Sequence, residues 1–204
     1  MIELCIKELE GVWYGVACEE EKIFATSFAS NEEKALKDLL VSIPFDAPFQ
    51  RSEKISAFAE RVITTLKNIY DGKDASQNFS LAAKHLPEYK TRVLEAARLI
   101  PPGYVTSYGA LAKNTSESPR AVGHVMASNP FAPIVPCHRV VGSDFSLVGY
   151  GGGLDAKLAF LKREKRGYTS EKEILVNGKK LEMWPVEFVL RKLEMSKQAI
   201  SKKR

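Results

Sequence analysis

The sequence predicts an α+β protein with two domains and a C-terminal extension. Residues 1–80 first alternate apolar with polar positions and then carry apolar residues at helical spacing, which predicts a small α/β domain. Residues 81–165 contain closely spaced helix starts, which predict a mainly helical, winged-helix-like domain with a helix-turn-helix. Residues 166–204 form the extension.

Three strands are expected at the start of the chain. Residues 2–7 alternate with a period of two, and the runs 12–18 and 22–28 are rich in aromatic and branched side chains. Glu10-Gly11 supplies a turn between the first two runs. This pattern predicts a small antiparallel sheet.

Two helices should follow these strands. Ser30 and Glu33 form a capping-box pattern that opens the first helix. The second helix is expected to begin near Ser52, and Gly72 can end it. Residues 73–86 hold no strong pattern and suit a linker between the domains.

The second domain begins with a short helix over about 89–100. Ser107 can cap a further short helix, and Ser118 followed by Pro119 is a strong start for the next one, which ends before Asn129. Two short helices joined by a small polar loop are typical of a helix-turn-helix, although such pairs also occur in proteins that never touch DNA.

The extension contains a hairpin signal and a final helix. Asn177-Gly178 is the dipeptide that favours a tight turn between two strands. The run VEFVLRKLE follows, and we expect it to be helical and the Lys- and Arg-rich tail after it to be disordered.

Charge divides unevenly between the two halves of the chain. Residues 1–80 carry 9 Lys and Arg against 14 Asp and Glu, a balance of −5, and the remaining 21 and 11 give residues 81–204 a balance of +10. A basic half next to an acidic one suggests a module that binds a polyanion. A solvated basic surface is the alternative.

Other bulk properties limit the class of protein. The three cysteines Cys5, Cys18 and Cys137 are too few and odd in number for a disulfide framework. No apolar run is long enough to span a bilayer, and the acidic N-terminus is unlike a secretory signal. We therefore expect a cytoplasmic protein that does not enter membranes.

The strongest local signal surrounds Cys137. This cysteine precedes His138 and Arg139 within an apolar, strand-like stretch, residues 134–141. Cysteine reacts as the thiolate, and a nearby imidazole can take its proton, directly or through water. The alternative is a buried structural cysteine beside a hydrogen-bonded histidine.

At these residues the sequence resembles the O6-alkylguanine-DNA alkyltransferase family, whose members are also called methylated-DNA–protein-cysteine methyltransferases. The resemblance covers about residues 89–165. Several separate motifs occur in the family's order: Pro102-Gly103, Val105 to Leu111, Arg120-Ala121-Val122-Gly123, Asn129-Pro130, Pro136-Cys137-His138-Arg139-Val140, Gly149-Tyr150-Gly151-Gly152-Gly153-Leu154 and Lys157.

The resemblance implies a direct-reversal DNA repair protein with a ribonuclease-H-like N-terminal domain. Cys137 would accept an alkyl group from O6 of guanine in double-stranded DNA, once per protein molecule. His138 would take the thiol proton through a water, Glu164 would orient His138, and Tyr108 would donate a hydrogen bond to the base. Whether O4-alkylthymine is also a substrate stays open.

It also implies roles in DNA binding and in the substrate pocket. Arg120 would fill the gap left by the rotated nucleotide, because a base must leave the duplex stack before O6 can be reached. Gly123, Ser107 and Ala121 would lie at the DNA. The pocket and its loops would include the following residues: Asn129, Met126, Arg139, Val140, Tyr150 and Gly151.

Two other classes of function and one metal site stand as alternatives. A binding protein that only marks lesions would lack the cysteine, which Cys137 argues against. A cysteine hydrolase would need an oxyanion site, and no such motif is evident. Cys5, Cys18 and His85 could contribute to a zinc site, but a structural site needs four ligands, so buried cysteines are favoured. We expect no metal, no cofactor and a monomer.

Overall fold

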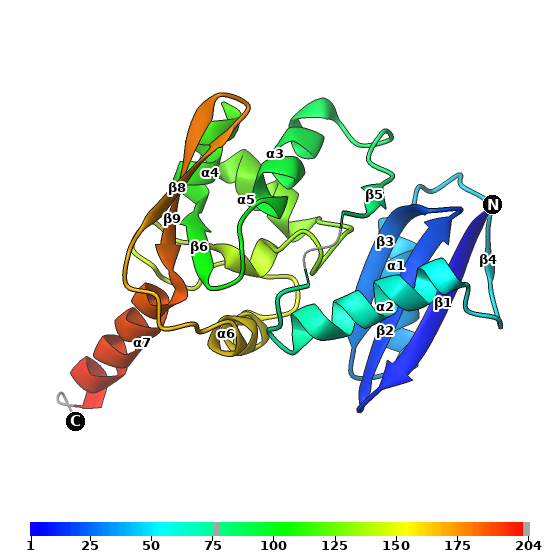
Figure 1. The fold of residues 1–204 in the computed structure, drawn as a ribbon, viewed down its shortest axis with the longest axis horizontal. Helices are drawn as coiled ribbons and strands as arrows, with labels where there is room; N and C mark the ends of the chain where they lie inside the picture. The colour runs from blue at the N-terminus through cyan, green and yellow to red at the C-terminus, as the bar shows by residue number, and fades with distance from the viewer. Residues whose placement is uncertain (76–77, 202–204) are drawn as a thin grey trace. The chain divides into compact units, whose positions relative to one another are not determined.

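The computed structural model describes residues 1–75 and 78–201 of the 204-residue chain. The elements run in this order along the chain: β1 (Ile2–Leu9), β2 (Val12–Glu19), β3 (Lys22–Ala29), α1 (Glu32–Ser42), β4 (Phe49–Arg51), α2 (Ala57–Tyr70), β5 (Ser80–Leu81), α3 (Glu88–Arg98), β6 (Tyr104–Ser107), α4 (Tyr108–Thr115), α5 (Pro119–Ala127), the 3-10 turn η1 (Cys137–Arg139), β7 (Val140–Val141), α6 (Leu154–Arg163), β8 (Lys172–Val176), β9 (Lys179–Pro185) and α7 (Val186–Ser201) (Figure 1). The predicted α+β class is confirmed.

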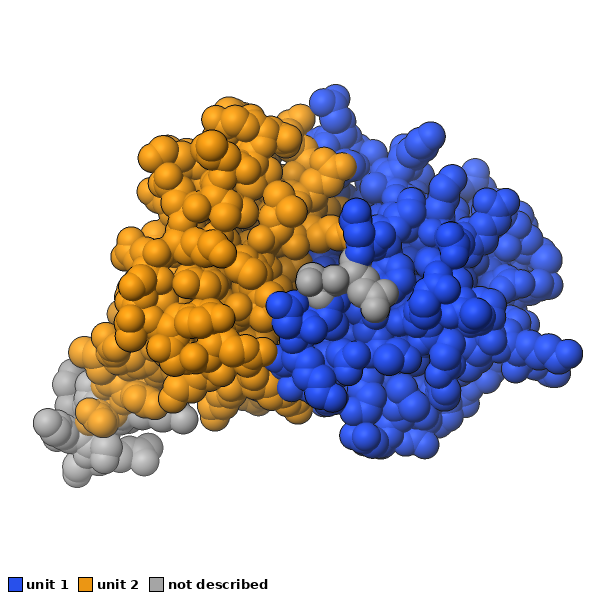
Figure 2. Space-filling view, viewed as in Figure 1, with its two compact units in different colours: residues 1–91, 128–135 blue, residues 92–127, 136–204 orange. Residues whose placement is uncertain are grey.

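The chain forms two compact units, coloured separately in Figure 2. The first unit contains residues 1–91 and 128–135, and the second contains residues 92–127 and 136–204. Residues 81–91 and 128–135 were expected in the second domain, but they fall in the first unit because they bond to strand β3. The amide of Ala82 donates to the carbonyl of Ile23, and the amide of Thr26 donates to the carbonyl of Pro130.

The first unit is a five-stranded sheet with a helix on each face. The sheet has the order β4-β1-β2-β3-β5, in which β1, β2 and β3 are antiparallel, as predicted, and the two edge strands run parallel to their neighbours. Successive side chains of a strand point to opposite faces. In β2, Ala17 faces α1, whereas Tyr14 meets Tyr70 of α2 edge-on.

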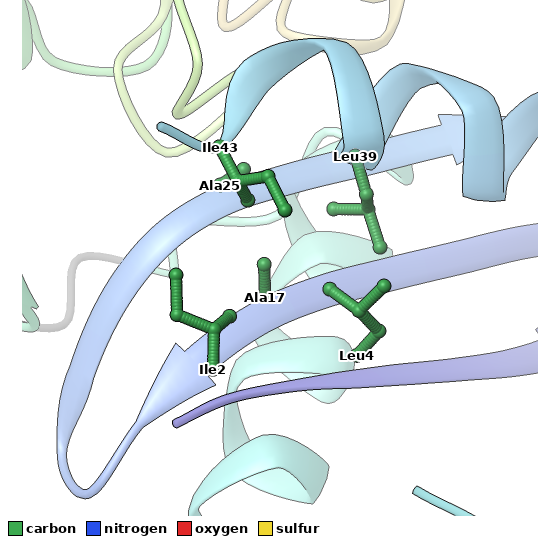
Figure 3. Close-up of a cluster of buried hydrophobic side chains, with 6 residues drawn as sticks. All are labelled: Ile2, Leu4, Ala17, Ala25, Leu39 and Ile43. Atoms are coloured by element: carbon green, nitrogen blue, oxygen red, sulfur yellow. The ribbon is translucent and has the colours of Figure 1, made fainter. Parts of the chain in front are cut away.

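A cluster of apolar side chains holds α1 against the sheet. Figure 3 shows this core, whose members are Ile2, Leu4, Ala17, Ala25, Leu39 and Ile43. Gly15 lets the helix come close, because a Cβ at this position would lie 2.8 Å from a methyl group of Leu39. The helix therefore depends on the alternating apolar pattern of the strands that the sequence analysis identified.

Several predicted boundaries in this unit are wrong. Asn31, rather than Ser30, caps α1, and its side chain accepts the amide of Lys34 at 2.9 Å. The second helix begins at Ala57 with Ser56 as its cap, and not near Ser52, because Ser52 donates its amide to Leu4 beside β1. The expected linker over 73–86 contains β5, which pairs with β3.

The second unit surrounds a four-stranded sheet of order β7-β6-β9-β8. The helix-turn-helix is α4 and α5, and its predicted caps are confirmed. The hydroxyl of Ser107 accepts the amide of Ala110 at 2.9 Å, and that of Ser118 accepts the amide of Ala121 at 3.1 Å. These caps begin the two helices at the residues that the sequence indicated.

The extension is part of the second unit and supplies half of its sheet. The predicted hairpin is present, because Asn177 and Gly178 both have positive φ, 50° and 75°, between β8 and β9. The predicted final helix is α7, but it continues to Ser201, so most of the tail expected to be disordered after VEFVLRKLE is helical; residues 202–204 lie outside the described residues. No helix of the described chain is long and apolar enough to cross a membrane.

Candidate active site

Cys137 begins the 3-10 turn η1 in the second unit. The stretch around it was expected to be strand-like, but the amide of Arg139 bonds to the carbonyl of Pro136 at 2.9 Å and closes a turn, and a strand begins only at Val140. The thiol-bearing residue is 5% exposed. The turn therefore presents Cys137, His138 and Arg139 in three different directions from one short segment.

The imidazole of His138 is fully buried and bonded on one side. Its Nε2 lies 2.9 Å from Oε1 of Glu164, and its ring stacks on Phe160 with 4.5 Å between ring centroids. Among the described residues, its Nδ1 has no hydrogen-bond partner. Burial lowers the pKa of His138, although Glu164 opposes this shift. A neutral ring that donates Nε2–H to the carboxylate carries its lone pair on Nδ1.

A buried ion pair fixes the carboxylate that holds His138. Arg139 donates from Nε to Oε2 of Glu164 at 2.9 Å and from Nη2 to Oε1 at 2.7 Å, and its Nη1 donates to the carbonyl of Ile100 at 2.6 Å. Burial alone would raise the pKa of Glu164, but His138 and Arg139 outweigh it and lower that pKa to about 2. Glu164 is therefore ionised near neutral pH.

Lys157 is a site residue to which the sequence analysis gave no role. It is fully buried, and its ammonium donates to the carbonyls of Val140 at 2.6 Å and Val148 at 2.8 Å. Burial lowers its pKa to about 8, while the charge of a Cys137 thiolate raises it. Helical spacing could have revealed it, because Lys157, Phe160 and Glu164 share one face of the segment around α6.

A pocket of about 270 Å³ lies beside the helix-turn-helix. Its lining consists of Tyr108, Pro119, Gly123, Ala127, Val148 and Gly149. The hydroxyl of Tyr108 donates to the carbonyls of Val148 and Gly149 at 3.3 and 3.2 Å. Burial, and then the charge of Cys137, raises the pKa of Tyr108 to about 12, so the phenol keeps its proton. The same two causes raise the pKa of Tyr150.

The remaining predicted residues occupy different places. Arg120 is exposed in the first turn of α5, with Ala121 half-buried after it, and Met126 is buried on the same helix. A Cβ on Gly123 would meet open space. Ser107 is buried and uses its hydroxyl as a helix cap. Gly151 is exposed in the turn before α6.

Asn129 belongs to the first unit and braces its own segment. Its Nδ2 donates to the carbonyl of Val135 at 2.8 Å, and its Oδ1 accepts the amide of Phe131 at 3.0 Å. These two bonds fold residues 129–135 into a closed turn. The family resemblance also implies that Asn129 braces the turn between α5 and the segment of Cys137, and this role stays a prediction.

The residues considered for zinc do not assemble into a site. His85 stacks on Phe24 at 6.4 Å between ring centroids, whereas Cys5 hydrogen-bonds to Cys18. Among the described residues, no group of three or more His, Cys, Asp or Glu is arranged to hold a metal ion. Both cysteines are buried in the first unit.

Known proteins share both the sequence of this site and the fold. Residues 88–166 match the family model described as 6-O-methylguanine DNA methyltransferase, DNA binding domain. The methylated-DNA–protein-cysteine methyltransferase of Mycobacterium leprae is 48% identical over 80 residues, which are 38% of this chain and 48% of that protein. The one of Pyrobaculum aerophilum is 55% identical over 65 residues, 32% of this chain and 44% of that protein. The match thus spans about half the length of these relatives.

Solved structures extend the likeness beyond the matched segment. The O6-methylguanine-DNA methyltransferase of Pyrococcus kodakaraensis superposes with a TM-score of 0.60 at 28% identity, covering 80% of this chain and 99% of that one. The Mycobacterium tuberculosis O6-methylguanine methyltransferase gives 0.62 at 25% identity, covering 81% and 93%. The fold and site define a helix-turn-helix protein with a buried cysteine centre. Residues 88–166 of this chain are similar to the DNA-binding domain of the O6-methylguanine-DNA methyltransferase family.

Replacing Glu164 by glutamine should destabilise the protein strongly at neutral pH. The substitution leaves the charge of Arg139 buried without its partner, so the free energy of unfolding should fall by about 3 kcal/mol. Urea unfolding at pH 7 measures this change. The matched control is Glu173→Gln, which removes an exposed carboxylate paired with exposed Lys180 and should change stability by less than about 0.5 kcal/mol.

Acid should reduce the difference between wild type and Glu164→Gln. The pKa of Glu164 is lowered on folding from 4.5 to about 2, so its stabilisation is complete above about pH 4.5 and is lost as the pH falls toward about 2. Glutamine cannot titrate. A stability difference that stays constant from pH 6 to pH 3 would contradict the buried ion pair as its cause.

Proposed function

We propose that this protein repairs alkylated DNA by transferring an alkyl group from O6 of guanine to Cys137. The observation that carries the proposal is the buried series Cys137, His138 and Glu164, within a segment that matches the methyltransferase family. The proposed substrate is double-stranded DNA containing O6-alkylguanine. Monomeric action without a cofactor, and in the cytoplasm, is part of the same proposal.

Activation of the thiol begins at His138. Its Nε2 is bonded to Glu164, and its buried Nδ1 has no bonded partner among the described residues, so Nδ1 is the atom that can accept a proton. A water between Nδ1 and the sulfur would carry the thiol proton to the ring. The negative charge of Glu164 stabilises the imidazolium that results, and the ammonium of Lys157 favours the thiolate.

The transfer is an in-line displacement at the alkyl carbon. A bond forms from carbon to the sulfur of Cys137 while the bond from carbon to O6 breaks, and the net reaction moves the thiol proton to guanine. Tyr108 keeps its proton because its pKa is raised to about 12, so it can donate a hydrogen bond to the base as O6 becomes a leaving group. Its present acceptors are the carbonyls of Val148 and Gly149, in the loop of the pocket.

Access to O6 requires the nucleotide to leave the duplex. Extrusion costs a few kcal/mol, and a side chain inserted in the gap recovers part of that cost. Arg120 is exposed in the first turn of α5, beside the pocket residues Pro119 and Gly123. With no side chain at Gly123, α5 can approach a DNA backbone closely. The first turn of α5 is therefore the segment that we place in the DNA.

The product explains why each molecule would act once. A thioether at Cys137 has no acyl or phosphoryl centre that water could attack. Nothing else in the second unit offers a second thiol, because Cys5 and Cys18 are buried in the first unit. His138 moves only protons and cannot reverse an alkylation.

Cys137→Ala should bind duplex DNA as wild type does and transfer no alkyl group. The sulfur supplies nucleophilicity but little binding surface, since the residue is 5% exposed. A gel-shift titration measures binding, and loss of O6-methylguanine from the duplex measures transfer. Cys18→Ala is the matched control and should transfer normally. Clearance of O6-methylguanine by Cys137→Ala would end the proposal.

Arg120→Ala should slow the repair of duplex DNA at least about tenfold more than it slows the reaction with O6-benzylguanine as the isolated base. Only the duplex requires extrusion, whose cost of a few kcal/mol the arginine partly recovers. Single-turnover rates on both substrates give the ratio. Arg191→Ala, on α7, is the control and should leave the ratio unchanged. Equal losses on both substrates for Arg120→Ala would show that it does not fill the gap.

A further inference from the structure

We propose that the hairpin of β8 and β9 is a wing that contacts the DNA backbone beside the helix-turn-helix. Its tip, residues 177–180, would bind phosphates next to the segment of duplex that receives α5. This inference rests on the proposed function for the docking of α5 on DNA. It assigns a role to the extension, which lies beyond the family match at residues 88–166.

The hairpin is built into the same sheet as the helix-turn-helix. Strand β9 pairs with β6, in a register that places Tyr104 opposite Pro185 and Val105 opposite Trp184. Strand β6 leads directly into α4, the first helix of the pair. The apolar side chains Leu181 and Met183 of β9 are fully buried. The wing is therefore a fixed part of the second unit rather than a loose appendage.

The tip of the hairpin is bonded to the turn between α4 and α5. Asn114, in the last turn of α4, donates from Nδ2 to the carbonyl of Lys179 at 3.0 Å. The ammonium of Lys179 donates to the hydroxyl of Ser116, which caps α4 in the left-handed conformation. Figure 1 shows the hairpin running alongside α4. Only Glu117 and Ser118 separate Ser116 from the start of α5.

The tip also has the chemistry of a phosphate contact. Lys180 is exposed, with 71% of its side chain accessible, and Lys179 and Lys113 are exposed beside the same turn. Lys180 lies 2.9 Å from Glu173, but this pair is on the surface, where such pairs contribute about 0–1 kcal/mol, so a phosphate can compete for the lysine. The acidic Glu117 in the turn is already paired with Arg92 at 2.6 Å.

Placement and charge together favour duplex DNA as the partner. In helix-turn-helix proteins the start of the second helix lies at the DNA, and basic side chains nearby neutralise phosphates and fix the orientation of the protein. A hairpin tip bonded to the residues before α5 would face the backbone next to that contact. The wing would therefore lengthen the duplex segment that the protein covers.

The test is the salt dependence of binding to an undamaged duplex. Each neutralised phosphate contributes about −0.9 to the slope of log affinity against log salt concentration. Lys180→Ala should make the slope about 0.9 less negative. Lys192→Ala, which removes a 46% exposed lysine of α7 that is likewise near one carboxylate, Asp144, should leave the slope at the wild-type value. Each variant is also reacted with O6-benzylguanine as the isolated base, at a rate expected to equal that of wild type.

The outcomes separate this inference from the proposed function. Equal slopes for wild type, Lys180→Ala and Lys192→Ala would overturn the wing, even if Cys137 is alkylated normally. The wing would also be overturned if Lys180→Ala reduced the rate of reaction with O6-benzylguanine by the same factor as the affinity for duplex DNA. The substitution would then have disturbed the whole second unit. A reduced slope in Lys180→Ala together with no alkylation of the wild type would support the wing and refute the proposed chemistry.

Discussion

The carboxylate of Glu164 connects three segments of the second unit that are far apart in sequence. Glu164 is the residue at the end of α6, and its carboxylate accepts hydrogen bonds from both His138 and Arg139 of η1. Arg139 also donates to the carbonyl of Ile100, which follows α3. A buried pair of this kind is costly to break because the remaining charge cannot reach water. The orientation of His138, the proton acceptor in the proposed mechanism, depends on this one carboxylate.

A second buried cation connects the turn that contains Cys137 to the pocket. Lys157 bonds to Val140, directly after η1, and to Val148 at the edge of the pocket, so one ammonium holds both segments. The extension also packs against the segment between β7 and α6. Phe145 of this segment meets Trp184 and Phe188 of the extension edge-on, at 5.8 and 5.6 Å between ring centroids. Residues beyond the family match thus help to position the wall of the pocket.

Signals carried by a few neighbouring residues could be interpreted from the sequence. Ser118 before Pro119 identified the start of α5, and Asn177-Gly178 identified the hairpin, whereas the turn at Cys137 was expected to be strand-like. Features that depend on partners distant in the sequence could not be predicted in this way. The short strands β4 and β5 exist because β1 and β3 offer them bonds, and the burial of Lys157 follows from three carbonyls in other segments. Asn31 and Ser30 are adjacent, and both side chains can cap a helix, so the sequence did not distinguish between them.

The central claim is that one buried thiol accepts one alkyl group and keeps it. Intact-mass measurement of the protein, incubated with an excess of duplex containing O6-methylguanine, tests this claim most directly. The account predicts a mass increase of one methyl group per chain, located on the peptide that contains Cys137, with product formation reaching a plateau at the amount of protein. Product formation that continues well beyond that amount, or a methyl group located on Cys5 or Cys18, would contradict it.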